Sequence, residues 1–406
     1  MVATSIPAGE PWLCLGGAGD LLGRPGGAVL ETRWTGSGWA TALDGRPLPS
    51  SPWEALEETT RSGGAPWLGA ATFELACAEA DLPHRTPAPG TLGQRWVELR
   101  SAFHRHPDGT LEGWAWTEEP PPPAAWRLPT PAPGPAPQLI LLPHWDAARH
   151  RAAVETLRER ILAGRFYVAN LCMPFEGNLT GEVLALARTA FHRARPPFGA
   201  YLDLGEVTLL SLTMERLLQR RGDLLRSGPI KGTAPLTGDP AADRAAAARL
   251  AADPKERAEH TMIVDLVRND LGRVARTGSV SVPRLMAVEP FPTVQHLVST
   301  VEATARPGLG LAELLRAVLP GGSVTGAPKH AVCAHLAGAE AGPRGFYCGA
   351  LGWIGPGGDL DLALPIRTAQ IAGGRVTYWA GGGITHRSDP AREWAELLLK
   401  TRALTG

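Results

Sequence analysis

The segment DPKERAEHTMIVDLVRNDLG, from Asp253 to Gly272, contains the strongest local structural signal in this chain. It predicts a helix, because the Asp253 carboxylate can cap the first turn and Pro254 fits the first helical position. Glu256 stands where the acidic residue of a capping box is found. The segment SDPAREWAELLLK, 388–400, begins in the same manner. We therefore expect two helices with similar starts.

Each of these predicted helices carries a pair of glutamates in its first turns. The pairs are Glu256 with Glu259, and Glu393 with Glu396. A spacing of three places both carboxylates of a pair on one helical face, where like charges repel. If the two helix starts meet, four carboxylates converge and require a divalent cation such as Mg²⁺. The same spacing is typical of solvated helix faces, with Glu396 and Lys400 as an ordinary ion pair, so spacing alone leaves both interpretations open.

The composition is that of a globular protein without a global electrostatic bias. The chain has 406 residues, zero formal net charge, 44% apolar residues and 20% charged residues. It is too long for a small disulfide-stapled scaffold and shows no preference for nucleic acid or an anionic membrane. No apolar run approaches the roughly 20 residues that span a bilayer, and we expect no signal peptide. The five cysteines form no CxxC pair, which favours reduced thiols, no zinc site and a cytoplasmic location.

A proline-rich stretch, EEPPPPAAWRLPTPAPGPAP at 118–137, divides the chain. It favours extended polyproline and predicts a connector between an N-terminal region, 1–117, and a catalytic region, 138–406. Short alternating runs before it predict antiparallel strands, which we expect to be woven into the same sheet core. After it, 147–163 predicts a helix that ends near Gly164. Alternation over 360–368 predicts a strand with Arg367 on its minority face.

Lysine is rare in this chain, and one lysine stands beside a glycine. The four lysines are Lys231, Lys255, Lys329 and Lys400. Lys231 lies in PIKGT, 229–233, where the following glycine lets a ligand approach the backbone. A lysine nucleophile must be uncharged to attack, which requires burial or a nearby cation. A solvated loop lysine is compatible with the same residues.

Two further patterns suit an anionic ligand. The run AGGGI, 380–384, follows a predicted strand over 375–379, and its glycines could present backbone N–H groups to an anion. A tight turn with positive φ explains the same glycines. Arg367 could bind a carboxylate in a bidentate manner, or lie on the surface. PGGSVTGAPK, 320–329, lacks P-loop spacing, so we expect no nucleotide site there.

Taken together, these segments resemble the chorismate-utilising enzyme family. The resemblance runs from about Ala163 to the C-terminus and depends on several motifs in order. They are PIKGT (229–233), AEHTMIVDLVRNDLGRVA (258–275), VQHLVS (294–299), PGGSVTGAPK (320–329), RGFYCGALGWIG (344–355), PIRTA (365–369) and GGGITHRSDPAREWAE (381–396). WLGAATFELA (67–76) is similar to the family's corresponding N-terminal segment. The resemblance implies an α/β (α+β) fold of the anthranilate synthase component I type, with two packed antiparallel sheets, flanking helices and a central active-site cleft.

Within this family the residue before Gly-Thr separates subgroups. The subgroup that aminates chorismate at C4 carries lysine, as Lys231 does here, and the subgroup that forms anthranilate carries alanine. The resemblance therefore implies a Mg²⁺-dependent transferase that makes 4-amino-4-deoxychorismate, a precursor of 4-aminobenzoate and folate, through a covalent lysine intermediate. Ammonia would come from a separate glutamine amidotransferase subunit. The alternatives are anthranilate or isochorismate formation, and a non-catalytic scaffold that binds a glutaminase.

The resemblance also implies roles for individual residues. The catalytic residues would be Lys231 as nucleophile, Glu215 as general acid and base, and His296. The chorismate site would comprise Thr233, Ser323, Tyr347, Arg367, Gly381, Gly382, Gly383 and Lys400. Glu259 and Glu396 would bind Mg²⁺, with Glu256 and Glu393 beside them. Two positions depart from the family: Thr213-Met214 precedes Glu215 where Ser-Pro is usual, and the run Val168 to Leu171 lacks the usual glutamine.

Overall fold

The computed structural model describes residues 13–15, 20–62, 64–105, 111–115, 136–291 and 294–405. The proline-rich connector predicted at 118–137 lies almost entirely outside these residues. The helices are α1 (Pro52–Ser62), α2 (Phe73–Glu79), α3 (Ala147–Leu162), α4 (Val183–Ala194), α5 (Pro240–Ala252), α6 (Pro254–Gly272), α7 (Leu311–Val318), α8 (Lys329–Ala339) and α9 (Pro390–Thr405). Among the described helices, none is both long and apolar enough to cross a membrane.

The strands pair in an antiparallel manner wherever the structure describes a pairing. The N-terminal strands are β1 (Leu13–Leu15), β2 (Asp20–Trp34), β3 (Trp39–Leu43), β4 (Arg46–Leu48), β5 (Trp67–Ala71), β6 (Leu92–Arg105) and β7 (Leu111–Ala115). The next are β8 (Gln138–Leu139), β9 (Leu142–Pro143), β10 (Val168–Thr180), β11 (Ala200–Asp203), β12 (Thr208–Ser211), β13 (Arg216–Arg221), β14 (Leu224–Gly228) and β15 (Ile230–Pro235). The last are β16 (Ser281–Pro290), β17 (Val294–Thr304), β18 (Gly326–Ala327), β19 (Ala350–Ile354), β20 (Leu360–Ala363), β21 (Thr368–Ala372) and β22 (Arg375–Ile384).

Two runs of paired strands start from β2 and form the two sheets. The first run passes through β6, β5, β19, β20, β13, β14 and β17 to β15 and β16. The second passes through β1, β11, β12, β21 and β22 to β10. Leu68 and Leu351 of the first run pack against Leu202 and Leu209 of the second. This confirms the expected fold of packed antiparallel sheets, and the N-terminal strands take part in both runs.

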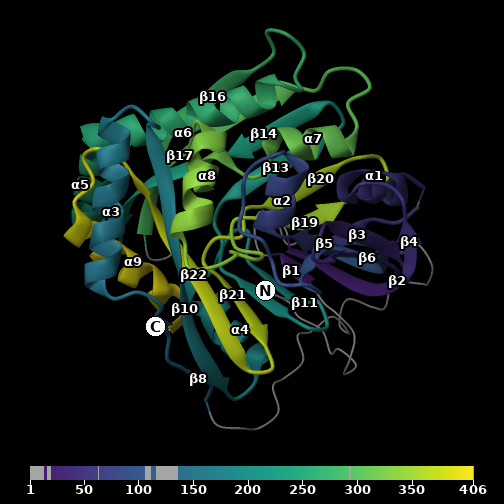
Figure 1. Cartoon of the computed structure of the whole chain (residues 1–406). Helices are drawn as coiled ribbons and strands as arrows, with labels where there is room; N and C mark the ends of the chain where they lie inside the picture. Colours follow the sequence, from purple (N-terminus) through teal and green to yellow (C-terminus); the bar gives the residue numbers. More distant parts are fainter. Residues whose placement is uncertain are drawn as a thin grey trace.

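Helices cover the remaining faces of the sheets (Figure 1). On one side α3, α4, α8 and α9 bury Val154, Phe191, Leu336 and Leu397 against β10 and β22. On the other, α1, α2, α6 and α7 pack on β13, β14, β17 and β20. In Figure 1, β10 and the yellow strand β22 run side by side, as their pairing requires. The two acidic helices, α6 and α9, thus belong to different layers of one structure.

Both predicted helix starts are confirmed. The Asp253 carboxylate accepts hydrogen bonds from the N–H groups of Lys255 and Glu256, and Asp389 accepts from Ala391 and Arg392. The Asp253 N–H donates to the Leu250 carbonyl, so it does not form the return bond of a capping box with Glu256. The glutamate side chain is therefore available to the interior of the molecule.

Two local predictions differ from the structure. Arg367 does not lie on a strand: β20 ends at Ala363, and Arg367 adopts φ +50°, in the left-handed region, before β21 begins. The glycine run after Trp379 is not a turn, because Gly381 lies inside β22 and pairs with Cys172 of β10. A Cβ at Gly381 would clash with the Cys172 sulfur and lie 2.5 Å from the Leu171 carbonyl oxygen. Close strand packing, and not positive φ, requires glycine there.

We expect substitution of Gly69 to weaken the link between the N-terminal strands and the rest of the sheet. Gly69 of β5 pairs with Trp96 of β6 and with Gly352 of β19. A Cβ at Gly69 would clash with the Arg95 carbonyl oxygen and lie 2.8 Å from Trp96 Cα. Gly69→Ala should lower the free energy of unfolding by about 2 to 3 kcal/mol in urea denaturation. Gly38→Ala is the control, because a Cβ there meets nothing within 4 Å; equal destabilisation by both variants would contradict the argument.

Candidate active site

Lys231 lies on β15 at an interruption of its ladder with β17. Gly232 at the interruption has φ +73°, a conformation that favours glycine. A Cβ on Gly232 would lie 3.1 Å from Oε2 of Glu256, so glycine also admits this carboxylate close to the strand. The lysine extends toward β22, since a Cβ on Gly383 would lie 3.7 Å from its Nζ.

The ammonium groups of the other three lysines are paired. They pair as Lys255 with Glu259 at 3.8 Å, Lys329 with Asp270 at 2.7 Å, and Lys400 with Glu396 at 2.9 Å. Within the described residues, Lys231 Nζ has no hydrogen-bond or ion-pair partner. Its positive charge nevertheless acts on four carboxylates: Glu215, Glu256, Glu259 and Glu396. Within the described residues, no hydrogen bond or ion pair therefore has to break before the Lys231 side chain reaches a ligand.

Glu215 is a buried carboxyl group close to this amine. Burial raises its pKa to about 7, although the charge of Lys231 and a hydrogen bond from the Ser323 hydroxyl act in the opposite direction. The Ser323 Oγ–Glu215 Oε1 distance is 2.8 Å. A carboxyl group that titrates near neutral pH can both donate and accept a proton under physiological conditions.

The threonine that replaces the family's serine holds Glu215 in place. Thr213 Oγ1 donates to the Leu364 carbonyl at 2.6 Å and accepts from the Glu215 N–H at 3.3 Å. The Leu364 N–H in turn donates to the Glu215 carbonyl at 3.0 Å. The backbone around the glutamate is therefore fixed by a hydroxyl group despite the departure at Thr213-Met214.

The glutamates of α6 and α9 interact across the two helices. The pKa of Glu259 is raised to about 7, mainly by burial; the charges of Lys255 and Lys231 lower it, and the charges of Glu256 and Glu393 contribute to the rise. Burial also raises the pKa of Glu256 and of Glu393, and the charge of Glu396 adds to both shifts. The exposed Glu396 behaves differently, because Lys400 lowers its pKa. The two helix starts therefore lie close enough for their carboxylates to repel.

These side chains offer ligands suited to Mg²⁺, but they are not already gathered around one point. Within the described residues, no three His, Cys, Asp or Glu side chains are arranged to hold a metal ion. Glu259 Oε1, however, is buried without a hydrogen-bond partner and lies among like charges. The Lys255 ammonium lies 3.8 Å from this oxygen, beyond hydrogen-bond distance, so the oxygen remains able to bind a metal cation or a proton. Because the donors are carboxylate oxygens, the chemistry of the set fits Mg²⁺.

His296 of β17 lies directly behind the lysine loop. Its Nδ1–H donates to the Gly232 carbonyl at 2.9 Å, and Thr233 Oγ1 is 3.1 Å from the same nitrogen. Burial lowers the pKa of His296 to about 4, so the ring is neutral at physiological pH. Its Nε2 is buried without a hydrogen-bond partner, which leaves an acceptor for a hydroxyl group of a ligand.

The remaining predicted binding residues surround the same region. Lys400 Nζ donates to the Gly381 carbonyl at 2.6 Å. Strand β21 pairs with β22 only as far as Tyr378, so the glycine run is paired on one side only, with β10. The Arg367 guanidinium has no hydrogen-bond or ion-pair partner among the described residues, and its charge acts on His296. Tyr347 is buried, and its ring stacks on Trp379. Its hydroxyl oxygen lies 3.9 Å from Cys172 Sγ.

The structure thus brings the predicted residues into one neighbourhood, while their individual roles remain predictions. Sequence reasoning missed the supporting residues Thr213, Arg344 and Glu340. In the sequence, Thr213 stands out only as a departure from the family, and Arg344 only as part of the motif that contains Tyr347. The positions of Thr213, two residues before Glu215, and of Arg344, three residues before Tyr347, are the available sequence signals; Glu340 has no such signal.

Comparison with known proteins identifies the family. A family model described as chorismate binding enzyme matches residues 53–406. The chain belongs to this family. The match extends well upstream of Ala163, where the sequence resemblance begins, and includes nearly all of α1, the whole of α2 and the strands β5, β6 and β7, whereas β1 to β4 precede it. The matched residues thus supply most strands of both runs, although β2, from which the two runs start, lies outside the match.

Individual members of the family are similar over long stretches. Aminodeoxychorismate synthase component 1 of Klebsiella aerogenes is 43% identical over 242 residues, 60% of this chain and 54% of the relative. An aminodeoxychorismate synthase of Streptomyces pristinaespiralis is 41% identical over 322 residues, 76% of this chain and 44% of the relative. The chain thus spans about half the length of the curated relatives it matches. The crystal structure of anthranilate synthase component I from Streptococcus pneumoniae TIGR4 has a TM-score of 0.81 and 26% identity, and the match covers 100% of this chain and 94% of that one.

We expect Mg²⁺ to stabilise this protein more at alkaline than at acidic pH. The folded-state pKa of Glu259 is about 7, raised from 4.5, so the folded protein holds an extra proton and loses stability as pH rises from about 4.5 to 7. Protons compete with the metal for the carboxylate. Millimolar Mg²⁺ should therefore raise Tm clearly near pH 8 and little near pH 6, as measured by differential scanning fluorimetry.

The control for this experiment lies on the same helix. Glu259→Gln should abolish the Mg²⁺-dependent rise in Tm, whereas Asp265→Asn, at an exposed position of α6, should retain it. An equal rise at both pH values, or a full rise in Glu259→Gln, would show that Mg²⁺ binds elsewhere.

Proposed function

We propose that this protein converts chorismate and ammonia to 4-amino-4-deoxychorismate, as aminodeoxychorismate synthase does. The observation that carries the proposal is the unpaired amine of Lys231 among the carboxylates of Glu215, Glu256 and Glu259. Relatives named aminodeoxychorismate synthase support it at 43% and 41% identity. The lysine before Gly-Thr, where the anthranilate-forming subgroup has alanine, supports the same reaction.

Binding a dianionic substrate requires fixed positive charge and hydrogen-bond donors. The Arg367 guanidinium, which is free of other partners among the described residues, would bind a carboxylate of chorismate in a bidentate manner. Backbone N–H groups of the glycine run, 381–383, would donate to the substrate, and Nε2 of neutral His296 would accept from a substrate hydroxyl. Mg²⁺ bound by Glu259 and Glu396, with Glu256 and Glu393 beside them, would supply charge to neutralise a substrate carboxylate.

The covalent steps require an uncharged lysine and a group that exchanges protons. The Lys231 amine attacks C2 of chorismate, both ring double bonds shift, and the C4–O bond breaks so that the hydroxyl leaves as water with a proton from Glu215. Ammonia then attacks C4, both double bonds shift back, and the bond between C2 and the lysine nitrogen breaks. Glu215 takes up the proton that ammonia loses. Its pKa of about 7 suits both transfers.

A separate partner would supply the ammonia. The name component 1 of the Klebsiella aerogenes relative implies a second component, and we propose that this is a glutamine amidotransferase for the present chain. The product would serve the synthesis of 4-aminobenzoate and folate. Because ammonia enters as a free molecule in this scheme, an ammonium salt should replace the partner.

Two substitutions of one residue test the role of Lys231. With chorismate, Mg²⁺ and ammonium, Lys231→Ala should lower the rate of 4-amino-4-deoxychorismate formation by ~10²-fold or more, since the nucleophile is lost. Lys231→Arg keeps the charge but cannot attack, so it should be equally impaired. The product is measured by mass spectrometry, with and without a lyase that releases 4-aminobenzoate. Full activity of Lys231→Arg would mean that position 231 acts only through its charge.

The same assay distinguishes the alternative functions. Direct formation of fluorescent anthranilate would identify an anthranilate synthase, and isochorismate formed without ammonium would identify an isochorismate synthase. A chain that consumes no chorismate but binds and activates a glutaminase would be a scaffold.

A further inference from the structure

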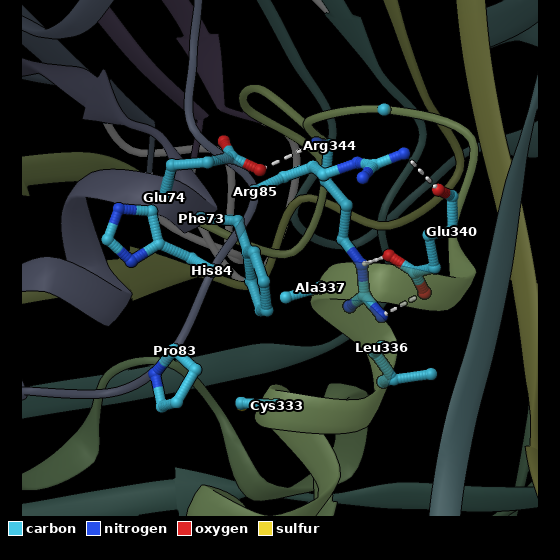
Figure 2. Close-up of a pocket in the computed structure, with 11 residues that line it drawn as sticks. Phe73, Glu74, Pro83, His84, Arg85, Cys333, Leu336, Ala337, Glu340 and Arg344 are labelled. Carbon is cyan, nitrogen blue, oxygen red and sulfur yellow. Dashed lines mark hydrogen bonds and ion pairs between the residues drawn. The ribbon is translucent and has the colours of Figure 1, made fainter.

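A buried ion pair lies behind the candidate site, between α2 and the end of α8 (Figure 2). The guanidinium of Arg344 bonds both carboxylate oxygens of Glu340, at 2.6 Å from Nη2 to Oε1 and 2.9 Å from Nε to Oε2. The two side chains are 1% and 6% exposed. Taking two charges out of water costs free energy that the attraction alone often does not recover. The remaining bonds of the pair therefore indicate why the charges are placed there.

The other donors of Arg344 bind backbone carbonyls of two separate segments. Nη1 donates to the Val324 carbonyl at 2.8 Å, and Nη2 donates to the Asn170 carbonyl at 2.9 Å. Glu340 Oε1 also accepts from the N–H of Cys172 at 3.0 Å. The ion pair thus fastens the turn that contains Val324 to β10.

The Arg344–Glu340 pair, with its bonds to Val324, Asn170 and Cys172, is called the clamp below. The residue before Val324 connects the clamp to Glu215. Ser323 lies in the 3-10 turn Gly322–Val324, and its hydroxyl donates to Glu215 at 2.8 Å. The Asn170 amide reaches the same Val324 carbonyl at 3.2 Å. Two donors on one carbonyl fix the orientation of the turn, and hence the direction of the Ser323 hydroxyl.

The clamp is itself fastened to the N-terminal half of the chain. Glu74 of α2 accepts hydrogen bonds from the backbone N–H groups of Arg344 and Gly345, at 2.6 and 3.1 Å. The ring of Phe73 lies 4.4 Å from the guanidinium carbon. Figure 2 shows Glu74 and Glu340 approaching Arg344 from opposite sides. The backbone of the loop that leads to Tyr347 is therefore fixed together with the guanidinium.

We propose that Arg344 is a positioning residue, which holds the Ser323 turn so that the Ser323 hydroxyl stays on Glu215 during the reaction. The proposal depends on the proposed function in one respect, namely that Glu215 exchanges protons with the substrate. Lysine cannot replace Arg344, because a single ammonium group cannot span Glu340 and both carbonyls in the manner of the planar guanidinium.

Loss of this clamp has a predictable electrostatic consequence. The hydrogen bond from Ser323 favours the ionised form of Glu215 and so lowers its pKa. In Arg344→Lys the turn is released, and the limb of the pH–rate profile that reports Glu215 should move upward by about one unit. Ser323→Ala should cause the same shift. Because both variants remove one interaction, the double variant should shift no further than either single variant.

Hydrogen–deuterium exchange tests the clamp without any assay of activity. In Arg344→Lys the amides of 321–327 should exchange ~10-fold faster or more, whereas those of 183–194 in α4, outside the clamp, should be unchanged. Arg85→Lys is the matched control: Arg85 donates to the backbone carbonyl of Glu340 at 3.0 Å, but it forms no hydrogen bond to Val324 or Asn170. It should leave both the exchange of 321–327 and the pH profile unchanged.

A second variant guards against misfolding. If Arg344→Lys does not fold, Arg344→Met combined with Glu340→Gln removes both buried charges and keeps an acceptor for Cys172. Unchanged exchange over 321–327 in the folded variant would overturn the proposal, as would additive pH shifts of Arg344→Lys and Ser323→Ala. A wild-type protein that does not consume chorismate would refute the proposed function, while the exchange result alone would still decide whether Arg344 holds the turn.

Discussion

The central constraint in this protein is electrostatic. The glutamates of the candidate site (Glu215, Glu256, Glu259, Glu393 and Glu396) outnumber its lysines (Lys231, Lys255 and Lys400), and water is partly excluded from the region. Burial is the main cause that raises the pKa of Glu215 and Glu259 to about 7, so both carboxyl groups change charge near neutral pH. A site of this kind is poised for proton transfer and for binding a cation, and the surrounding fold has to hold the like charges together.

The fold achieves this by bringing together segments that are far apart in the chain. Lys231 comes from β15 in one run of strands, whereas the glycine run comes from β22 in the other, and α6 and α9 add the acidic residues from separate layers. Close strand packing at Gly381 and the left-handed backbone at Gly232 let charged groups approach where a Cβ would keep them away.

Rigid support of the proton-transfer group depends on buried polar contacts. Thr213 fixes the backbone of Glu215, and the Arg344–Glu340 pair fixes the turn that carries Ser323. The pair also bonds the backbone of β10, and the Glu74 side chain of α2 holds the backbone N–H of Arg344, so segments from both halves of the chain help to hold one hydroxyl group. These hydrogen bonds to backbone groups around the site explain how the ion pair can be retained although burying its two charges is unfavourable.

The sequence by itself determined the two helix starts, the fold type and the family, because capping and ordered motifs depend on short-range chemistry that neighbouring residues specify. It also indicated Lys231 and the paired glutamates as candidates. Only the tertiary structure decided three further features. The glycine run continues strand β22, Arg367 lies between two strands, and the Arg344 guanidinium donates to the Val324 carbonyl. The Ser323–Glu215 bond joins residues 108 positions apart. Contacts at such separation, and the burial that shifts the pKa of each carboxyl group, arise from the packing of all layers together, which no local pattern of residues encodes.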